Sequence, residues 1–97
     1  MDHQKYTDED IHANLRTVPG WTYENGQITR TFQLPSFPSA LLFVNTVGHF
    51  AEQAGHHPDI DIRYNKVKLS LSTHDAGGIT DKDFALARRI TPLYSHE

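Results

Sequence analysis

The sequence has no cysteine, no long apolar run and no excess of positive charge, and each absence excludes a class of protein. Without cysteine there can be no disulfide bond, thiolate metal site or cysteine nucleophile. No stretch reaches the roughly 18 consecutive apolar residues that a membrane-spanning helix needs. The chain also opens on polar and acidic residues rather than on the apolar core of a signal peptide. We therefore expect a soluble, cytoplasmic protein without membrane association.

Basic residues are few and scattered along the chain. Lys and Arg together number 9, against 12 Asp and Glu, and the formal net charge is -3. Because proteins that bind phosphate backbones usually present clustered basic residues, we expect no direct contact with nucleic acid. A length of 97 residues predicts one domain with one modest hydrophobic core, spanning residues 1–97.

Two short helices are predicted from the same capping pattern. Thr7 and Thr80 each precede a segment with a carboxylate at the third helical position, where hydroxyl and carboxylate can cap each other's backbone N–H groups. The first helix should stop before Pro19, because the residue before a proline disfavours helical geometry. The last helix should run to about Ile90.

The longest predicted helix begins after Ser36, which can serve as its N-cap, with Pro38 tolerated in the first turn. Pro58 is expected to end it, which would place His56 and His57 in its last turn. Its first half carries more apolar residues than one buried stripe needs. Either a second subunit covers the excess, or the sheet and the other helices cover all of it.

Four strands complete the expected fold. Asn25–Gly26 between two β-rich runs is a strong hairpin signal. Apolar residues alternate with polar ones over residues 60–64 and 67–73, which predicts a half-solvated antiparallel hairpin with its turn at Asn65–Lys66. The element order is α-β-β-α-β-β-α. We therefore expect an α+β fold with a four-stranded antiparallel sheet and three helices on one face.

Histidines and carboxylates gather near the end of the long helix. His49, Glu52 and His56 are spaced by three and four residues, so they would share one helical face, and Glu52 could reach His56. Imidazoles suit general acid–base catalysis, because they give and take protons near neutral pH. Two alternatives stay open: a solvated helix end, or a zinc or iron site made by these residues and His74.

The residues downstream of Glu52 resemble the pterin-4a-carbinolamine dehydratases over most of the chain. Gly20-Trp21 lies upstream, and the strand ends on Leu71-Ser72-Thr73-His74. The spaced pattern that carries the resemblance is Glu52-x3-His56-His57-Pro58-x5-Tyr64-x9-His74-x8-Asp83.

The resemblance implies the same fold and a dehydration of 4a-hydroxytetrahydropterin to quinonoid dihydropterin. This step recycles the cofactor of aromatic amino-acid hydroxylases, and it requires no metal or other cofactor. His56 and His57 would be the central acid–base pair, and His74 would assist departure of the leaving group. The residues implied to bind or support the substrate are Glu52, Asp83, Trp21, Pro58, Ser72 and Thr73.

Several of these residues also have a purely structural interpretation. Asp83 occupies the capping position of the last helix, where a carboxylate stabilises any helix. Trp21 could simply belong to the core. His74 falls on the polar face of its strand and would point to solvent, unless the strand ends or bulges at Thr73.

The resemblance also bears on partners. It favours a homodimer or homotetramer that associates through sheet edges and the long helix, with a pterin as the small-molecule substrate. A second hypothesis is a protein-binding module. Some members of the family act as dimerisation cofactors and coactivators of a homeodomain transcription factor, so the partner would be such a factor or a hydroxylase.

Overall fold

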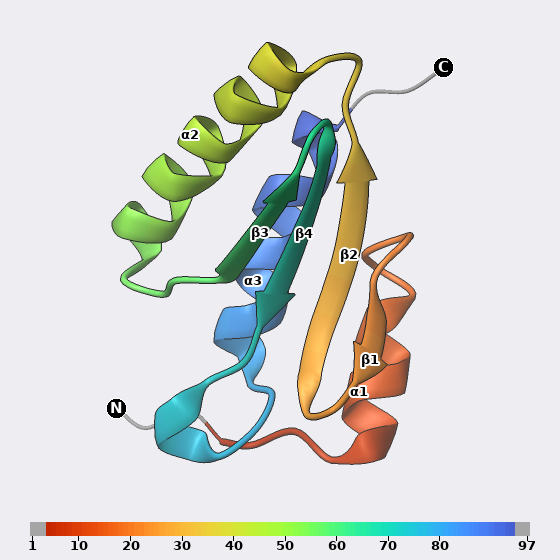
Figure 1. Ribbon diagram of the computed structural model, residues 1–97. Helices are drawn as coiled ribbons and strands as arrows, with labels where there is room; N and C mark the ends of the chain where they lie inside the picture. Colours follow the sequence, from red (N-terminus) through yellow and green to blue (C-terminus); the bar gives the residue numbers. More distant parts are fainter. Residues whose placement is uncertain (1–3, 95–97) are drawn as a thin grey trace.

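The computed structural model describes residues 4–94, which form a four-stranded sheet and three α-helices (Figure 1). The predicted element order is confirmed. Figure 1 shows α3 running behind the sheet and α1 behind β1. The elements in chain order are α1 (Asp8–Leu15), β1 (Thr22–Glu24), β2 (Gln27–Gln33), α2 (Phe37–Ala54), β3 (Asp59–Arg63), β4 (Lys66–Leu71), the 3₁₀ turn η1 (His74–Ala76), α3 (Asp81–Ile90) and η2 (Thr91–Leu93).

The sheet is antiparallel throughout, with the strand order β1-β2-β4-β3. The first hairpin turns at Asn25 and Gly26, as predicted, and both residues have positive φ, 53° and 77°. The long strands β2 and β4 pair in the centre. The two edges are β1, which is only three residues long, and β3.

The second hairpin turns one residue earlier than the sequence suggested. Lys66 already pairs with Arg63, so the turn consists of Tyr64 and Asn65, and Tyr64 adopts a φ of 54°. The side-chain amide of Asn65 donates to the backbone carbonyl of Leu34 at 2.8 Å, and the backbone carbonyl of Asn65 accepts from the Leu34 N–H. These two bonds hold Asn65 at the end of β2, which leaves Lys66 free to join the strand.

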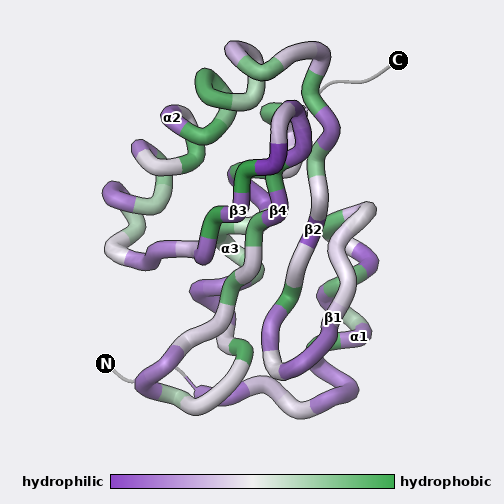
Figure 2. Tube along the Cα trace, in the orientation of Figure 1, coloured by the Kyte–Doolittle hydropathy of each residue, from purple (hydrophilic) through white to green (hydrophobic). Residues whose placement is uncertain are grey.

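The core lies between the sheet and the helices, on the face to which the odd-numbered residues of β4 point. Figure 2 shows the hydrophobic and hydrophilic residues following each other along this strand. The opposite face carries Lys66, Lys68 and Ser70. The core consists of Ile11, Val18, Trp21, Ile28, Phe32, Ala40, Phe43, Val47, Ala51, Val67, Leu69, Leu71, Ile79, Phe84, Leu86, Ala87 and Ile90.

Helix α2 buries one row of side chains and leaves part of its apolar surface exposed. Leu42 is 69% exposed, Leu41 41% and Phe37 44%, and Figure 2 shows this apolar first half of the helix. Ile60 and Ile62 on the edge strand β3 are exposed as well. The sheet and the other helices of a single chain therefore do not cover all of the apolar surface of α2, and the alternative that they do is wrong.

The ends of the helices follow the predicted caps, with one exception. Capping boxes are present at Thr7 and Thr80, and Ser36 caps α2. The exception is the end of α2, which stops at Ala54 rather than at Pro58. None of the helices within residues 4–94 is long and apolar enough to cross a membrane.

Gly55 ends α2 because it adopts the left-handed conformation, with a φ of 64°. Its N–H, and that of His56 behind it, turn back onto carbonyls of the last helical turn. This is the usual role of glycine after a helix, since other residues adopt this geometry at a cost. His56 and His57 consequently lie in the connection to β3 and not in the last helical turn, where we expected them.

Candidate functional site

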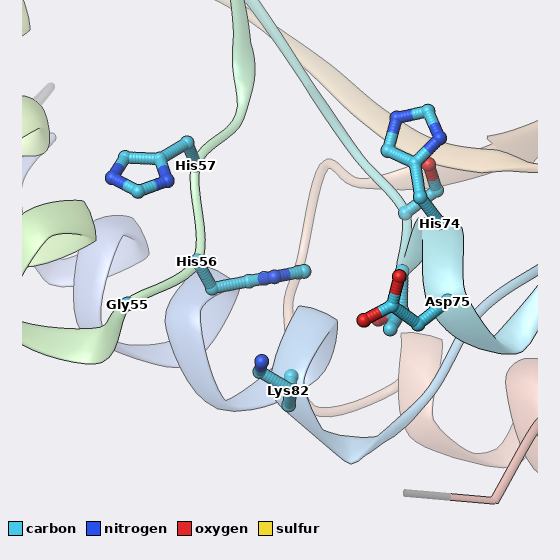
Figure 3. A pocket seen from close by; sticks show the side chains of 8 residues that line it. Gly55, His56, His57, His74, Asp75 and Lys82 are labelled. Atoms are coloured by element: carbon cyan, nitrogen blue, oxygen red, sulfur yellow. The ribbon is translucent and has the colours of Figure 1, made fainter.

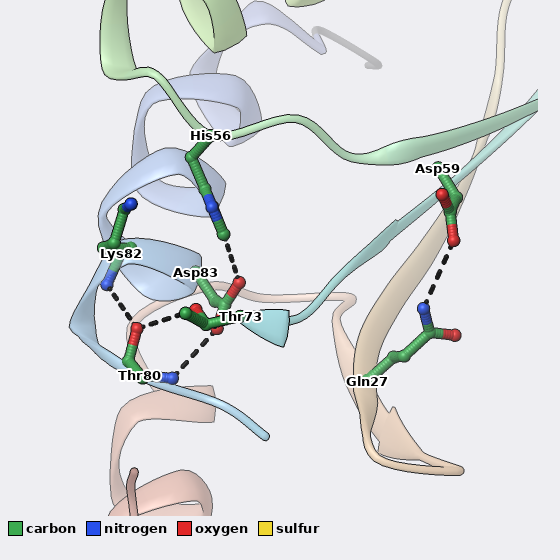
Figure 4. A network of polar contacts seen from close by, with 7 residues as sticks. All are labelled: Gln27, His56, Asp59, Thr73, Thr80, Lys82 and Asp83. Carbon is green, nitrogen blue, oxygen red and sulfur yellow. Dashed lines mark hydrogen bonds and ion pairs between the residues drawn. The ribbon is translucent and has the colours of Figure 1, made fainter. Parts of the chain in front are cut away.

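A buried imidazole–carboxylate pair joins the connection after α2 to the start of α3. The Nε2 atom of His56 lies 2.6 Å from Oδ1 of Asp83. His56 is 8% exposed and Asp83 is fully buried (Figure 4). Asp83 thus has two roles. One carboxylate oxygen bonds to His56, and the other caps α3 by accepting the Thr80 backbone N–H at 2.9 Å.

Two buried hydroxyls extend this pair into a chain of hydrogen bonds. Thr73 Oγ1 donates to Oδ2 of Asp83 at 2.9 Å, and Thr80 Oγ1 lies 2.8 Å from Thr73 Oγ1. Because the Thr73 proton is already used, the Thr80 hydroxyl must be the donor in the second bond. The strand end that holds Thr73 is therefore tied to the helix start that holds Asp83.

The protonation pattern of His56 follows from this network. An ionised carboxylate only accepts hydrogen bonds, so the Nε2 atom of His56 carries a proton and donates it to Asp83. The other ring nitrogen, Nδ1, takes no part in this bond. Every buried side-chain polar atom within residues 4–94 has a hydrogen-bond partner. A fully satisfied buried network of this kind holds its members in one arrangement.

His56 and His74 line the same hollow, which has a volume of about 280 Å³ (Figure 3). Strand β4 ends at Leu71, and the 3₁₀ turn η1 starts at His74. Pairing between Thr73 and Gly78 closes the loop behind it. The strand thus ends before its alternation would fix the direction of His74. The lining residues are Gly55, His56, His57, Ser72, Thr73, His74, Asp75 and Lys82.

We had expected Glu52 to pair with His56, but it pairs with His57 instead. Oε1 of Glu52 lies 3.0 Å from Nε2 of His57, and the two side chains are 83% and 65% exposed. The left-handed Gly55 turns the chain off the helix axis, so the spacing that would have brought His56 beside Glu52 no longer applies. Glu52 is itself absent from the lining of the hollow.

Two charged residues of the hollow were not singled out from the sequence. Asp75 and Lys82 both line it, and Figure 3 shows Lys82 below the His56 ring. Their only sequence signal is their position, directly after His74 and directly before Asp83. Neither neighbour nor spacing says that a charged side chain faces a hollow, because that depends on how η1 and α3 meet.

Three other candidates lie elsewhere. Trp21 is buried in the core, where its indole N–H donates to Thr91 Oγ1 at 2.9 Å, which agrees with the structural alternative. Pro58 is half-buried in the connection and does not line the hollow. His49 bonds to Gln53 on the surface of α2. A role of Trp21 or Pro58 toward a substrate stays a prediction.

The residues considered as a metal site do not gather. His56 is bonded to Asp83, Glu52 to His57 and His49 to Gln53, so each has a different partner. Within residues 4–94 no three His, Asp or Glu side chains come together in an arrangement that could hold a metal ion.

The sequence matches the family model described as pterin 4 alpha carbinolamine dehydratase over residues 4–93. A relative from Roseiflexus sp. (strain RS-1) is 58% identical over 89 residues, covering 92% of this chain and 96% of the relative. A relative from Nocardia farcinica is 48% identical over 93 residues, covering 96% and 98%. Both are provisionally named pterin-4-alpha-carbinolamine dehydratase.

Solved structures agree. A Brucella melitensis protein described as a transcriptional coactivator/pterin dehydratase superimposes with a TM-score of 0.91 at 30% identity, covering 95% of this chain and all of that one. A pterin dehydratase-like RuBisCO assembly factor of the alpha-carboxysome has a TM-score of 0.64 at 18% identity, covering 79% and 89%, which shows the shared fold alone. The matches extend over nearly the whole sequence, and the chain belongs to the pterin 4 alpha carbinolamine dehydratase family.

Proposed function

We propose that this protein dehydrates a 4a-hydroxytetrahydropterin to the quinonoid dihydropterin. The C4a–O bond and the N5–H bond break, a C4a=N5 double bond forms, and one water leaves. No electrons are gained or lost overall, so the reaction needs acid–base groups rather than a redox cofactor. The observation that carries the proposal is the hollow shared by His56 and His74, in a chain of this family.

His56 is the proposed base that accepts the N5 proton. Its Nε2 atom is held 2.6 Å from the buried Asp83 carboxylate, so the proton would arrive at Nδ1. The carboxylate then faces an imidazolium, which it stabilises electrostatically. In serine proteases, an aspartate does the same for the catalytic histidine. Thr73 and Thr80 keep that carboxylate oriented through the bonds to its second oxygen.

His74 is the proposed acid that protonates the departing 4a-hydroxyl. It is exposed at the rim of the hollow, where it can exchange protons with water between turnovers. The exposed His57 would contact the pterin ring from the other side of the hollow rather than carry a proton itself. The activity would recycle the pterin cofactor of aromatic amino-acid hydroxylases in the cytoplasm.

The direct test generates the carbinolamine and follows its dehydration spectroscopically, with buffer alone, with wild-type protein and with His56→Ala. We expect the wild type to accelerate the reaction far above buffer and His56→Ala to lose most of that acceleration. Circular dichroism and urea unfolding would check that the variant is folded. Equal rates for wild type and variant would overturn the assignment.

A second candidate function is a protein-binding module, which the description of the Brucella melitensis protein as a coactivator favours. The exposed apolar residues of α2, Leu41 and Leu42, are the proposed contact. In this case Leu42→Ser would abolish partner binding, whereas His56→Ala would not. The opposite pattern in a pull-down with a candidate hydroxylase or transcription factor would exclude this role.

Self-association is proposed through the same region. Strand β3 is an edge strand whose outer side has no neighbour in the described residues, and Ile60 and Ile62 are exposed on it. Edge strands readily pair with another chain, and identical surfaces pair about a two-fold axis. Light scattering should therefore give a dimer or tetramer. A monomer at high concentration would contradict this proposal without affecting the catalytic one.

A further inference from the structure

A second hollow, of about 140 Å³, lies where the end of α2 meets one face of α3. The residues of α3 that line it recur at spacings of three and four, which places them on the same side of that helix. The lining consists of Ala54, His56, Lys82, Ala85, Leu86 and Arg89. Only His56 and Lys82 also line the hollow described above, so most of this one has no part in the proposed reaction.

The walls of the second hollow are mostly apolar. Ala54, Ala85 and Leu86 contribute side chains made of carbon alone, and Leu86 belongs to the hydrophobic core. An apolar cavity of about 150 Å³ is large enough to bind benzene, so the second hollow, at about 140 Å³, suits a single ring. Larger ligands usually occupy about 300–1,000 Å³. The second hollow is therefore too small for a bicyclic pterin with its side chain.

Two cations stand beside these apolar walls. The Arg89 guanidinium donates through Nη2 to Oε1 of Gln53 at 2.9 Å, and its Cζ lies 4.1 Å from the centre of the Phe50 ring. Both partners belong to α2, so they hold the guanidinium at the hollow before a ligand binds. A guanidinium has five N–H donors, and the bond to Gln53 uses one of them. The Lys82 ammonium makes no ion pair within residues 4–94.

No carboxylate among the described residues lines the second hollow to offset these two cations. Two carboxylates that lie close by in the chain, Glu52 and Asp83, are each bonded to a histidine. Arginine recognises a carboxylate through paired, charge-assisted hydrogen bonds. A ring that carries one carboxylate therefore matches both features of the hollow, because the ring displaces water from the apolar walls while the carboxylate faces Lys82 and Arg89.

We propose that the second hollow binds a small aromatic carboxylic acid in its ionised form. The ring inserts between the end of α2 and α3, and the carboxylate pairs with Arg89 and Lys82. Because His56 and Lys82 line both hollows, an occupant of the second contacts two residues of the first. Ligands that share contacts in this way change each other's affinity. The second hollow is thus a site from which an aromatic acid regulates the first.

The test titrates the ¹⁵N-labelled protein with phenylacetate and follows the backbone amide signals by NMR. We expect a Kd of about 1 mM, because so small a ligand has few atoms to contribute, and the largest shifts at Ala85, Leu86 and Arg89. Benzyl alcohol has the ring without the charge, and acetate has the charge without the ring. Each should bind at least about tenfold more weakly than phenylacetate. Equal affinity for phenylacetate and benzyl alcohol, or shifts centred on the exposed Leu42 instead, would overturn the inference.

Two arginine variants remove the same charge from neighbouring positions of α3. Arg89→Gln should weaken phenylacetate binding about tenfold, whereas Arg88→Gln should leave it unchanged, because Arg88 bonds to Asn14 and Thr17 instead. Equal losses in the two variants would reduce the effect to net charge and overturn the site.

A third variant tests the apolar part of the hollow. Ala85→Leu keeps a good helix former and fills the space, so it should abolish binding. Undiminished binding in this variant would exclude the hollow. Thermal unfolding checks that all three variants are folded. Binding is measured without catalytic turnover, so failure of the proposed dehydratase activity and failure of this inference are separate results.

Discussion

Two neighbouring histidines of this protein each meet a carboxylate, and the two pairs differ in almost every physical respect. His56 and Asp83 are 2.6 Å apart with side chains 9% and 0% exposed, whereas His57 and Glu52 are 3.0 Å apart and 65% and 83% exposed. Solvent screens the second pair, and both of its side chains lose rotational freedom on pairing, so it should contribute little. The first pair is shielded from water.

The difference shows that the hydrogen bonds around a carboxylate determine its contribution to stability more than the ion pair does. Asp83 accepts from His56, from the Thr73 hydroxyl and from the Thr80 backbone. Loss of any one partner leaves a buried polar group without its bond, and this cost exceeds the net value of the bond itself.

The largest expected contrast is between His56→Ala and His57→Ala. Loss of a general acid–base group typically lowers kcat by about 10²–10⁴-fold. His57→Ala should lower it less than about tenfold, because within residues 4–94 the His57 side chain is held by an exposed ion pair alone. Stopped-flow measurement of carbinolamine dehydration gives both values. Similar losses for the two variants would mean that burial does not distinguish their roles.

Asp83→Asn should reduce both activity and stability. The amide NH₂ of asparagine cannot accept the bonds that both oxygens of Asp83 now receive, so the free energy of unfolding should fall by about 1–3 kcal/mol. Loss of the charge would also remove the partner that stabilises the His56 imidazolium. Asp81→Asn, in the exposed part of the same helical turn, is the matched control. Urea unfolding and kcat of both variants decide the point.

Gly55→Ala should destabilise the protein by about 1–2 kcal/mol, because Ala must adopt the left-handed φ of 64° that ends α2. No atom lies within 4 Å of the added Cβ, so the cost is one of backbone strain and not of collision. Gly48→Ala within the same helix is equally uncrowded and should instead stabilise by about 0.5–1 kcal/mol. Opposite signs in thermal unfolding are the expected result.

Glu52→Gln should have the smallest effect. An exposed pair contributes about 0–1 kcal/mol, and salt screens it further. Unfolding curves of the wild type and Glu52→Gln should therefore nearly coincide at high ionic strength. A loss as large as that of Asp83→Asn would show that Glu52 acts in an assembly or on a ligand, and not as one half of a surface pair.

Local features of the fold could be predicted from the sequence, because they depend on residues that are close in the chain. The capping boxes at Thr7 and Thr80 and the turn at Asn25–Gly26 involve four residues each at most, and all three are present. The alternation of apolar and polar residues along β4 likewise predicted which face of the strand is buried. Among the residues that the resemblance singled out, His56 and His74 line one hollow, and Asp83 holds His56 in place through a hydrogen bond.

Partners that are distant in the chain could not be predicted. Glycine occurs at turns and in helices alike, so its presence alone did not show that Gly55 would end α2 and turn Glu52 toward His57. The bond between Thr73 and Thr80 and the charged side chains at the hollow depend on how a strand end meets a helix start. The sequence by itself determined which elements form and which residue types gather. Packing of those elements alone decided which histidine is buried, because burial depends on everything that surrounds a side chain.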